Sequence, residues 1–401
     1  MTVSPLEIVQ PGRRVTHVAL GVGVGGLVLW VFGSFADPRQ AFASYLVAYA
    51  TGVSLAIGAL LIVMIGHVTN ATWFVVIRRV TETVAATLPI FALLFVPLLF
   101  GLGSLYPWAR PLDTLSPHLQ SSILAKRAYL SVPFFILRAA LYFIIWSGVS
   151  LWLRRESIRQ DTDPSTAPWR RQRRISAGAL PPVALALTFA SFDWLMSLSP
   201  DWWSSIYGVY YFSGAMVGAL ALVAVLTTVC QRSGSLTYLV SPEHYGALGK
   251  LLLTFVIFWA YIAFAQYLII WIADVPAEAS WYLVRTRGSW GALGLVMLGG
   301  HFIIPFLLLL FHRLKRTPTF MLALGAWLLA MHYLDIYWLA MPSLYPDGLH
   351  ASWLTLVAIL AVGGIATAFG LRLLHGHAIV PRGDPELAAS LEYGKTWAEE
   401  E

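Results

Sequence analysis

Several ionisable side chains lie inside long apolar stretches of this sequence, where a charge is costly. Arg138, Asp193 and Asp335 are charged, and His332 lies three residues before Asp335, on the same face of a helix. A charged side chain near the centre of a bilayer costs about 2.5 to 3.5 kcal/mol, so each of these residues is a candidate functional group. Carboxylates and imidazoles are common proton acceptors and donors. The pattern therefore favours proton transfer, in the half of the membrane away from the N-terminus.

Three further polar residues complete this set of candidates. Tyr142 follows Arg138 by four residues, on the same helical face, and Gln266 lies in another apolar stretch. His301 lies four residues before Pro305, which cannot donate a hydrogen bond to its carbonyl group. We therefore expect a bend there with a free acceptor. The sequence leaves open which acid pairs with Arg138.

A second polar group is expected at the opposite side of the membrane. It consists of Arg78, Arg79 and Glu82 at the end of one apolar stretch, with His67 at the end of another. A proton path across the membrane would need both groups, so these four residues are candidates for proton entry.

Structural roles are the alternative for each candidate. Asp193 and Asp335 could cap helices or form ion pairs near the outer interface, where charge is cheap, and Arg138 could neutralise one of them. A buried histidine usually has its hydrogen bonds satisfied within the protein. His301 and His332 could also ligate a haem between two helices, although no haem-specific spacing supports this.

The composition requires membrane helices to position these residues. The 401 residues are 58% hydrophobic and 11% charged, whereas soluble domains are about 45 to 50% apolar and about 25% charged. A transmembrane helix needs about 20 residues, and ten stretches are long enough: 15–34, 43–66, 83–103, 130–151, 179–198, 205–229, 247–272, 289–311, 319–341 and 351–373. We expect an all-α polytopic membrane protein with about ten transmembrane helices.

The single cysteine and the charge distribution exclude several kinds of site. Cys230 alone cannot provide a disulfide, an iron–sulfur cluster or a thiolate zinc site, so we expect no metal bound by this chain. The net charge of +6 does not indicate nucleic acid, because the basic residues are scattered between apolar stretches. On the side of the N-terminus lie 19 of the 26 lysines and arginines, which predicts cytoplasmic N- and C-termini.

An internal repeat predicts two four-helix bundles. Tyr49 and Gly52 in the second stretch are echoed by Tyr211 and Gly214 in the sixth, Pro133 in the fourth by Pro305 in the eighth, and Asp193 before Pro200 by Asp335 before Pro342. Because the repeat has four spans, both copies cross the membrane in the same sense. We predict one domain, 1–375, with bundles 43–198 and 205–341 and flanking helices 15–34 and 351–373.

Glycine spacing predicts close helix packing. Gly21 and Gly25 are four residues apart, as are Gly214 and Gly218, and small residues at this spacing let helices approach closely in lipid. We expect the first and last spans to be seams against other helices or subunits. The polar segment 152–178 and the acidic tail 376–401 are expected to be solvated, although either could dock a soluble partner.

Whole segments of the chain resemble one known family. They are 67–73 (HVTNATW), 78–82 (RRVTE), 187–207 (LTFASFDWLMSLSPDWWSSIY), 244–250 (HYGALGK), 259–271 (WAYIAFAQYLIIW) and 276–285 (PAEASWYLVR). They are similar to the polysulfide-reductase-type (NrfD-like) membrane subunits, and within these to the smaller of the two such subunits of alternative complex III, a bacterial quinol:cytochrome c oxidoreductase.

The resemblance implies a subunit of a respiratory complex in the bacterial inner membrane. It implies a larger NrfD-like sister subunit, an extracytoplasmic iron–sulfur protein, haem c subunits and a possible terminal oxidase as partners. It also implies menaquinol or ubiquinol oxidation coupled to proton release or translocation, with no metal in this chain, which is not expected to be catalytic alone. The better supported quinol site of the family lies in the larger sister subunit. A secondary transporter and a passive membrane anchor are the alternative functions.

Overall fold

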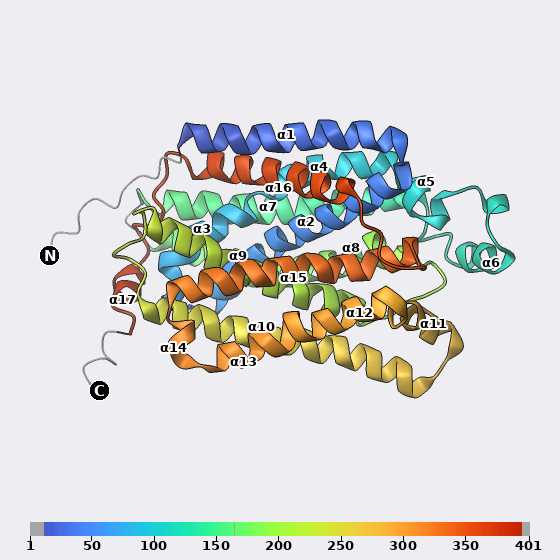
Figure 1. Cartoon of the computed structure of the whole chain (residues 1–401). Helices are drawn as coiled ribbons and strands as arrows, with labels where there is room; N and C mark the ends of the chain where they lie inside the picture. Colours follow the sequence, from blue (N-terminus) through green and yellow to red (C-terminus); the bar gives the residue numbers. More distant parts are fainter. Residues whose placement is uncertain (1–11, 164, 395–401) are drawn as a thin grey trace.

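Ten helical spans long and apolar enough to cross a membrane occur in residues 12–163 and 165–394, the part of the chain that the computed structural model describes (Figure 1). They are α1 (Arg13–Ala36), α2 (Pro38–Thr69), α3 and α4 (Val75–Ala85 and Leu88–Phe100), α7 (Val132–Arg159), α8 (Ala167–Trp194), α9 (Tyr207–Arg232), α10 (Pro242–Ala273), α12 and α13 (Gly288–Met297 and Ile304–Leu310), α15 (Pro318–Leu344) and α16 (Trp353–Leu374). The predicted fold class is confirmed. The chain ends themselves, predicted to be cytoplasmic, lie outside the described residues.

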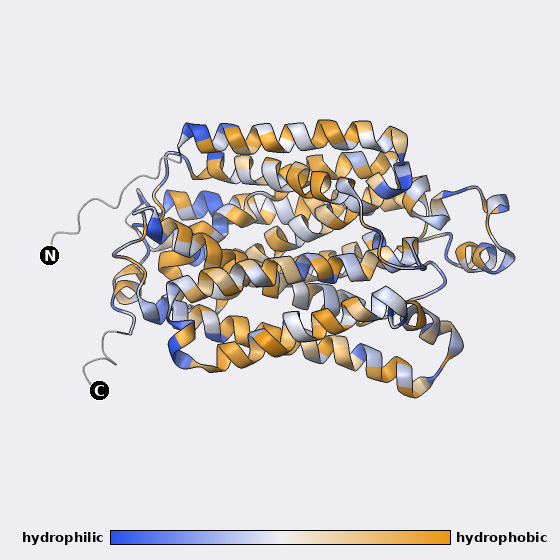
Figure 2. Ribbon diagram, in the orientation of Figure 1, coloured by the Kyte–Doolittle hydropathy of each residue, from blue (hydrophilic) through white to orange (hydrophobic). Residues whose placement is uncertain are grey.

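The two ends of the helix bundle are distinguished by their short helices. We call the end where α1 begins the proximal end and the opposite end the distal end. At the proximal end, α16 ends, and α14 (His312–Lys315) and α17 (Leu387–Leu391) are located. At the distal end are α5 (Leu102–Leu105), α6 (Pro117–Ala125) and α11 (Pro276–Arg285). Figure 2 shows hydrophilic residues gathered near the ends of the bundle and mostly hydrophobic residues along the spans between them.

The spans pack both within and between the two predicted groups of four. In the first group α2 packs against α3, α4 and α8, and α7 packs against α8; in the second group α9 packs against α10 and α15. The contact of α2 with α9 joins the groups, and α16 packs against α2 and α1. The helix α2 is therefore at the centre of the protein, which explains why almost its whole circumference is buried.

The third and eighth spans are interrupted. The third has a turn at Ala86 and Thr87, between α3 and α4, and the eighth contains a π-helical turn, Leu298–Ile303, between α12 and α13. A bend with a free acceptor was expected before Pro305, and the structure has this π turn instead. Within it the carbonyl group of Gly300 accepts a hydrogen bond from Trp327 Nε1 at 2.7 Å.

Two of the expected boundaries are wrong. The third span begins at Thr72, not near residue 83, so Arg78, Arg79 and Glu82 lie inside a helical span and are buried. The segment 152–178 is mostly helical, because α7 continues to Arg159 and α8 begins at Ala167. Hydropathy did not predict the start of the third span, the end of α7 or the beginning of α8, because paired or exposed charged residues lower the local hydropathy there.

Much of the expected acidic tail is also packed. Residues 376–394, here called the C-terminal strap, lie against the proximal end, with Ala378, Ile379, Val380 and Ser390 buried. Residues 395–401 of that tail lie outside the described residues. The strap is therefore not the solvated segment that its composition predicted.

The glycine seam between the first and last spans uses a different face of α1 from the one expected. A Cβ atom on Gly23 would lie 2.5 Å from the backbone nitrogen of Ile365, and one on Gly364 would lie 2.6 Å from that of Gly23. A Cβ on Gly21 or Gly25 would meet no atom within 4 Å. The first and last spans are therefore a seam against each other.

One of the three sequence echoes does not mark equivalent positions. Pro133 is the second residue of α7, at the distal end, whereas Pro305 lies in α13, in the proximal part of the eighth span. Asp193 and Asp335, by contrast, both lie in the distal parts of their spans.

Candidate functional site

In the first bundle, Asp193 of α8 is paired with Arg138 of α7. Arg138 Nη2 donates to Asp193 Oδ1 at 2.8 Å, and Arg138 Nε donates to Asp193 Oδ2 at 2.9 Å. The hydroxyl of Tyr142 donates to the same Oδ2 atom at 2.7 Å. The guanidinium group also lies over the rings of Tyr129 and Phe134, at 3.8 and 4.3 Å from their centroids. This two-pronged, fully partnered geometry is that of a strong structural ion pair.

In the second bundle, Asp335 of α15 has neutral partners. Its Oδ1 atom accepts a hydrogen bond from the Tyr210 hydroxyl at 2.7 Å, and its Oδ2 atom accepts one from Trp259 Nε1 at 3.1 Å. Asp335 is 1% exposed. Among the described residues, no lysine, arginine or histidine lies within ion-pair distance of its carboxyl group. Two acids at related positions of the repeat therefore have different surroundings.

His332 connects this acid to the first bundle. It lies one helical turn from Asp335, on the proximal side, and its Nε2 atom is 2.8 Å from the Ser54 hydroxyl of α2. Its Nδ1 atom is buried and has no hydrogen-bond partner in the described part of the chain. Gly214 and Gly218 of α9 make room for it, because a Cβ on Gly218 would lie 2.6 Å from His332 Cδ2. The predicted role of this glycine pair in close packing is confirmed.

His301 lies in the π turn, beside Trp259, which donates a hydrogen bond to Asp335. Its ring is 4.1 Å from that of Trp259, centroid to centroid, and it is completely buried. Neither ring nitrogen has a hydrogen-bond partner among the described residues. Trp259 therefore contacts both Asp335, through Nε1, and His301, through its ring. We call Ser54, Tyr210, Trp259, His301, His332 and Asp335 the Asp335 cluster.

Both histidines that could ligate a haem have contacts within the protein. His301 packs on Trp259, and Nε2 of His332 faces Ser54 on another helix. Among the described residues, no three histidine, cysteine or acidic side chains are grouped so that they could hold a metal ion.

The sequence interpretation missed a buried arginine at the distal end. Arg285 of α11 donates to the carbonyl groups of Trp281 and Leu339, at 3.1 and 2.8 Å, and to the Ser343 hydroxyl at 3.0 Å. It also lies 3.4 Å from the centroid of the Trp281 ring. Burial lowers the pKa of Arg285 to about 9. The sequence did not indicate this burial, because Arg285 lies in a short helix between two spans and not within an apolar stretch.

Gln266 lies on the same face of α10 as Trp259, two turns nearer the distal end. It is buried, and its side-chain oxygen has no hydrogen-bond partner among the described residues. It therefore extends the polar interior of the second bundle from the Asp335 cluster toward the distal end.

The proximal candidates form an ion-pair network with residues from three segments. Glu82 pairs with Arg78 and Arg79, at 3.1 and 3.5 Å. Arg78 also pairs with Asp384 of the strap at 2.6 Å, and Arg79 pairs with Asp161 at 3.0 Å. Asp161 and Asp384 were missed because they appeared to lie in a solvated loop and tail.

His67 lies beside this network and keeps a free nitrogen. Its Nδ1 atom is 2.9 Å from the Ser176 hydroxyl, and its Nε2 atom has no hydrogen-bond partner among the described residues. A cavity of about 20 Å³, lined by residues that include His67, Arg78 and Asp384, adjoins it. This volume is enough for about one water molecule.

The structure thus separates the predicted site residues into three groups. Arg138, Tyr142 and Asp193 meet in the first bundle, and the Asp335 cluster occupies the second. The third group is the proximal network. Aromatic rings, among them Trp194 and Tyr49, whose centroids are 5.6 Å apart, fill the interior of the first bundle next to Asp193. The candidates therefore do not form one continuous polar interior.

Comparison with known proteins gives this chain no family by itself. No family model matches the sequence, and no curated protein matches it either.

Proposed function

We propose that this chain is a membrane subunit of a bacterial respiratory complex that oxidises quinol and reduces cytochrome c, and that it carries protons in the distal half of the membrane. The segments 67–73, 187–207 and 259–271, which resemble NrfD-like subunits, support this assignment. Ten spans and a buried acid among histidines agree with it. In this proposal the proximal end, with most of the basic residues, faces the cytoplasm.

The contrast between Asp193 and Asp335 carries the proposal. Burying an ionised carboxylate without a cation costs far more than burying a neutral one. Asp193 has a fixed cation in Arg138, which compensates its buried negative charge. Within the described residues, the hydrogen-bond partners of the Asp335 carboxyl group are the Tyr210 hydroxyl and the Trp259 indole. Asp335 is therefore the acid in this pair suited to bind and release a proton.

The neighbouring imidazoles provide the next steps. A histidine can take up a proton on one ring nitrogen and release one from the other. His332 has Nε2 at Ser54, and its Nδ1 and both nitrogens of His301 have no hydrogen-bond partner in residues 12–163 and 165–394. Gln266 leads from Trp259 toward the distal end. Protons would move between these groups and the distal side, and His67 with its free Nε2 is the candidate for entry at the proximal end.

The electrons would be handled by other subunits. In the proposed complex, quinol electrons pass to an extracytoplasmic iron–sulfur protein and then to haem c subunits, beside a larger sister of this chain. This subunit would conduct protons beside the quinol site of that sister and would not be catalytic alone.

A secondary transporter is the second candidate, since two spans are interrupted. In transporters built from repeats, interrupted helices occupy corresponding positions in the two halves. Here the interruptions are in the second span of the first bundle and the third span of the second bundle. This mismatch favours the respiratory subunit.

The test is proton release by the intact complex. The complex would be purified in mild detergent, placed in liposomes and supplied with quinol and cytochrome c, and protons per electron would be measured. Asp335→Asn should lower this ratio while electron transfer continues, and Asp335→Glu should restore part of it. Asp274→Asn is the control, because Asp274 is an exposed acid in a left-handed conformation (φ 47°) that asparagine tolerates.

Two results would reject the proposal. If the ratio is unchanged when Asp193→Asn and Asp335→Asn are combined, the chain does not conduct protons through these acids and is a passive anchor. If no iron–sulfur protein or cytochrome c purifies with the chain, the respiratory assignment fails and the transporter must be tested.

A further inference from the structure

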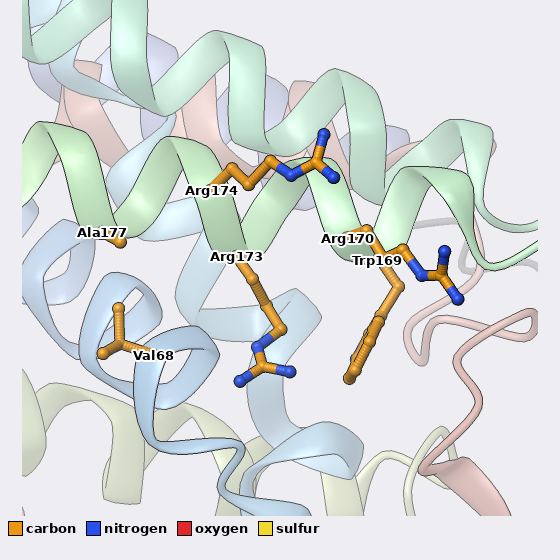
Figure 3. A pocket seen from close by; sticks show the side chains of 6 residues that line it. All are labelled: Val68, Trp169, Arg170, Arg173, Arg174 and Ala177. Carbon is orange, nitrogen blue, oxygen red and sulfur yellow. The ribbon is translucent and has the colours of Figure 1, made fainter.

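An open cleft at the proximal end combines arginines with apolar side chains. It has a volume of about 350 Å³ and lies between the end of α2 and the beginning of α8 (Figure 3). We call it the basic cleft; it is lined by Val68, Trp169, Arg170, Arg173, Arg174 and Ala177. Figure 3 shows Trp169 and Arg173 extending from α8 toward the side where Val68 lies, whereas Arg174 extends to the other side.

The arginines of the cleft lack counter-ions. Among the described residues, Arg170 and Arg173 form no ion pair and donate no side-chain hydrogen bond. The guanidinium group of Arg173 lies 4.8 Å from the centroid of the Trp169 ring, which holds it at the cleft. By contrast, Arg171 of the same helix pairs with Glu156 at 3.2 Å. The nearby acids Glu82, Asp161, Asp384 and Glu156 pair with Arg78, Arg79 and Arg171. In the part of the chain that the structure describes, no acid pairs with Arg170 or Arg173.

The cleft lies where the polar start of α8 meets its apolar part. Arg170 to Arg174 precede an apolar stretch that begins at Ile175, and α2 ends at Thr69. Arginines and a tryptophan at this level of a membrane helix are located among the lipid headgroups. Val68 and Ala177 add an apolar side to the cleft. A ligand that matches both sides carries a phosphate next to an apolar chain.

We propose that the basic cleft binds the phosphate of an anionic phospholipid from the leaflet at the proximal end. Arg170 and Arg173 would hold the phosphate, since guanidinium groups bind phosphate oxygens through two parallel hydrogen bonds. Trp169 would lie at the level of the glycerol backbone, and an acyl chain would pass along Val68 and Ala177. Basic pockets between membrane helices on this side bind anionic headgroups in the same way.

The test measures lipid binding to the purified chain by native mass spectrometry. Cardiolipin and phosphatidylglycerol are the anionic probes, and phosphatidylcholine is the zwitterionic one. The Arg170→Gln, Arg173→Gln double variant should bind cardiolipin about 25-fold more weakly, roughly fivefold for each arginine near the surface. Its thermal stability should change little, because neither side chain forms an ion pair among the described residues and Arg173 loses only its contact with the Trp169 ring.

The matched control is Arg171→Gln, which removes one positive charge from the same helix, as Arg170→Gln or Arg173→Gln does alone. Arg171 already pairs with Glu156, so this variant should keep its affinity for cardiolipin. An equal loss in the control would show attraction by overall charge only and would overturn the proposal. So would unchanged binding in the double variant, or displacement of the lipid by an excess of inorganic phosphate.

A protein partner would give a different result. If the double variant releases a subunit from the complex but binds cardiolipin as before, the cleft is a protein interface and the lipid proposal fails. Neither result bears on proton release through Asp335, which lies in the distal part of α15.

Discussion

Gly214 lies against both Asp335 and His332. A Cβ atom on Gly214 would be 3.0 Å from Asp335 Oδ2 and 3.5 Å from His332 Nδ1. The acid and the imidazole thus share one small surface of α9, and this contact exists because both glycines of the pair on α9 lack a side chain. The carboxyl group of Asp335 and the imidazole of His332 are positioned by helix packing as well as by hydrogen bonds.

The first prediction concerns the second glycine of that pair. Gly218→Ala should lower the free energy of unfolding by about 1 to 3 kcal/mol, because the added methyl group would overlap His332 and Leu55. Thermal unfolding in detergent micelles would measure it. Gly25→Ala is the control, since its Cβ would meet nothing within 4 Å. Equal stability of the two variants would show that His332 is not held as described.

The second prediction concerns the ion pair of the first bundle. Arg138→Gln should destabilise the protein by about 3 to 5 kcal/mol, because the Asp193 carboxylate would be left buried without its cation. Combining Arg138→Gln with Asp193→Asn should recover much of this loss. A double-mutant cycle of thermal unfolding would measure the coupling. Purely additive effects would contradict the pairing.

The third prediction concerns the C-terminal strap. Asp384→Asn should loosen residues 376–394, since Arg78 would lose a buried charged partner at 2.6 Å. Hydrogen–deuterium exchange of the strap should become faster, and a protease that cuts after arginine should cleave at Arg382 more readily. Glu392→Gln, at an exposed position of the same segment, should change neither rate. A strap that stays protected would show that Asp384 is not its anchor.

The fourth prediction concerns orientation. In a Cys230→Ser background, a cysteine at His118 of α6 should react with a membrane-impermeant maleimide added to intact spheroplasts. A cysteine at Tyr238, which is 96% exposed between α9 and α10, should react only after permeabilisation. The distribution of lysine and arginine predicts this difference. The reverse pattern would place the proximal end outside the cytoplasm.

Apolar runs of sufficient length predicted the spans well, because a helix of about 20 apolar residues has few alternatives to crossing a membrane. The prediction failed where charged residues neutralise one another. Arg78, Arg79 and Glu82 lower the local hydropathy, yet all three lie buried in a helix. Glu82 pairs with both arginines, Asp384 of the strap pairs with Arg78, and Asp161 pairs with Arg79. Hydropathy of single residues contains no information on such pairing.

The candidate acids could be found from the sequence, but their difference could not. Asp193 and Asp335 each lie seven residues before a proline and are equally isolated in apolar stretches. Only the helix arrangement shows that Arg138 of α7 reaches Asp193, whereas Trp259 of α10 reaches Asp335. These partners are 55 and 76 residues away in sequence.

The last prediction tests whether the hydrogen bond from Trp259 to Asp335 affects proton release. Trp259→Phe removes the indole donor at 3.1 Å from Asp335 Oδ2 but keeps an aromatic ring for His301 to pack on. We expect a loss of about 1 kcal/mol in the free energy of unfolding, and slower proton release by the intact complex, because the ionised carboxylate would keep only Tyr210 as a donor. Trp327→Phe is the matched control, since it removes a 2.7 Å hydrogen bond to Gly300 in the π turn. It should lower stability by a similar amount and leave proton release unchanged, so equal release rates in the two variants would mean that the indole only stabilises the fold.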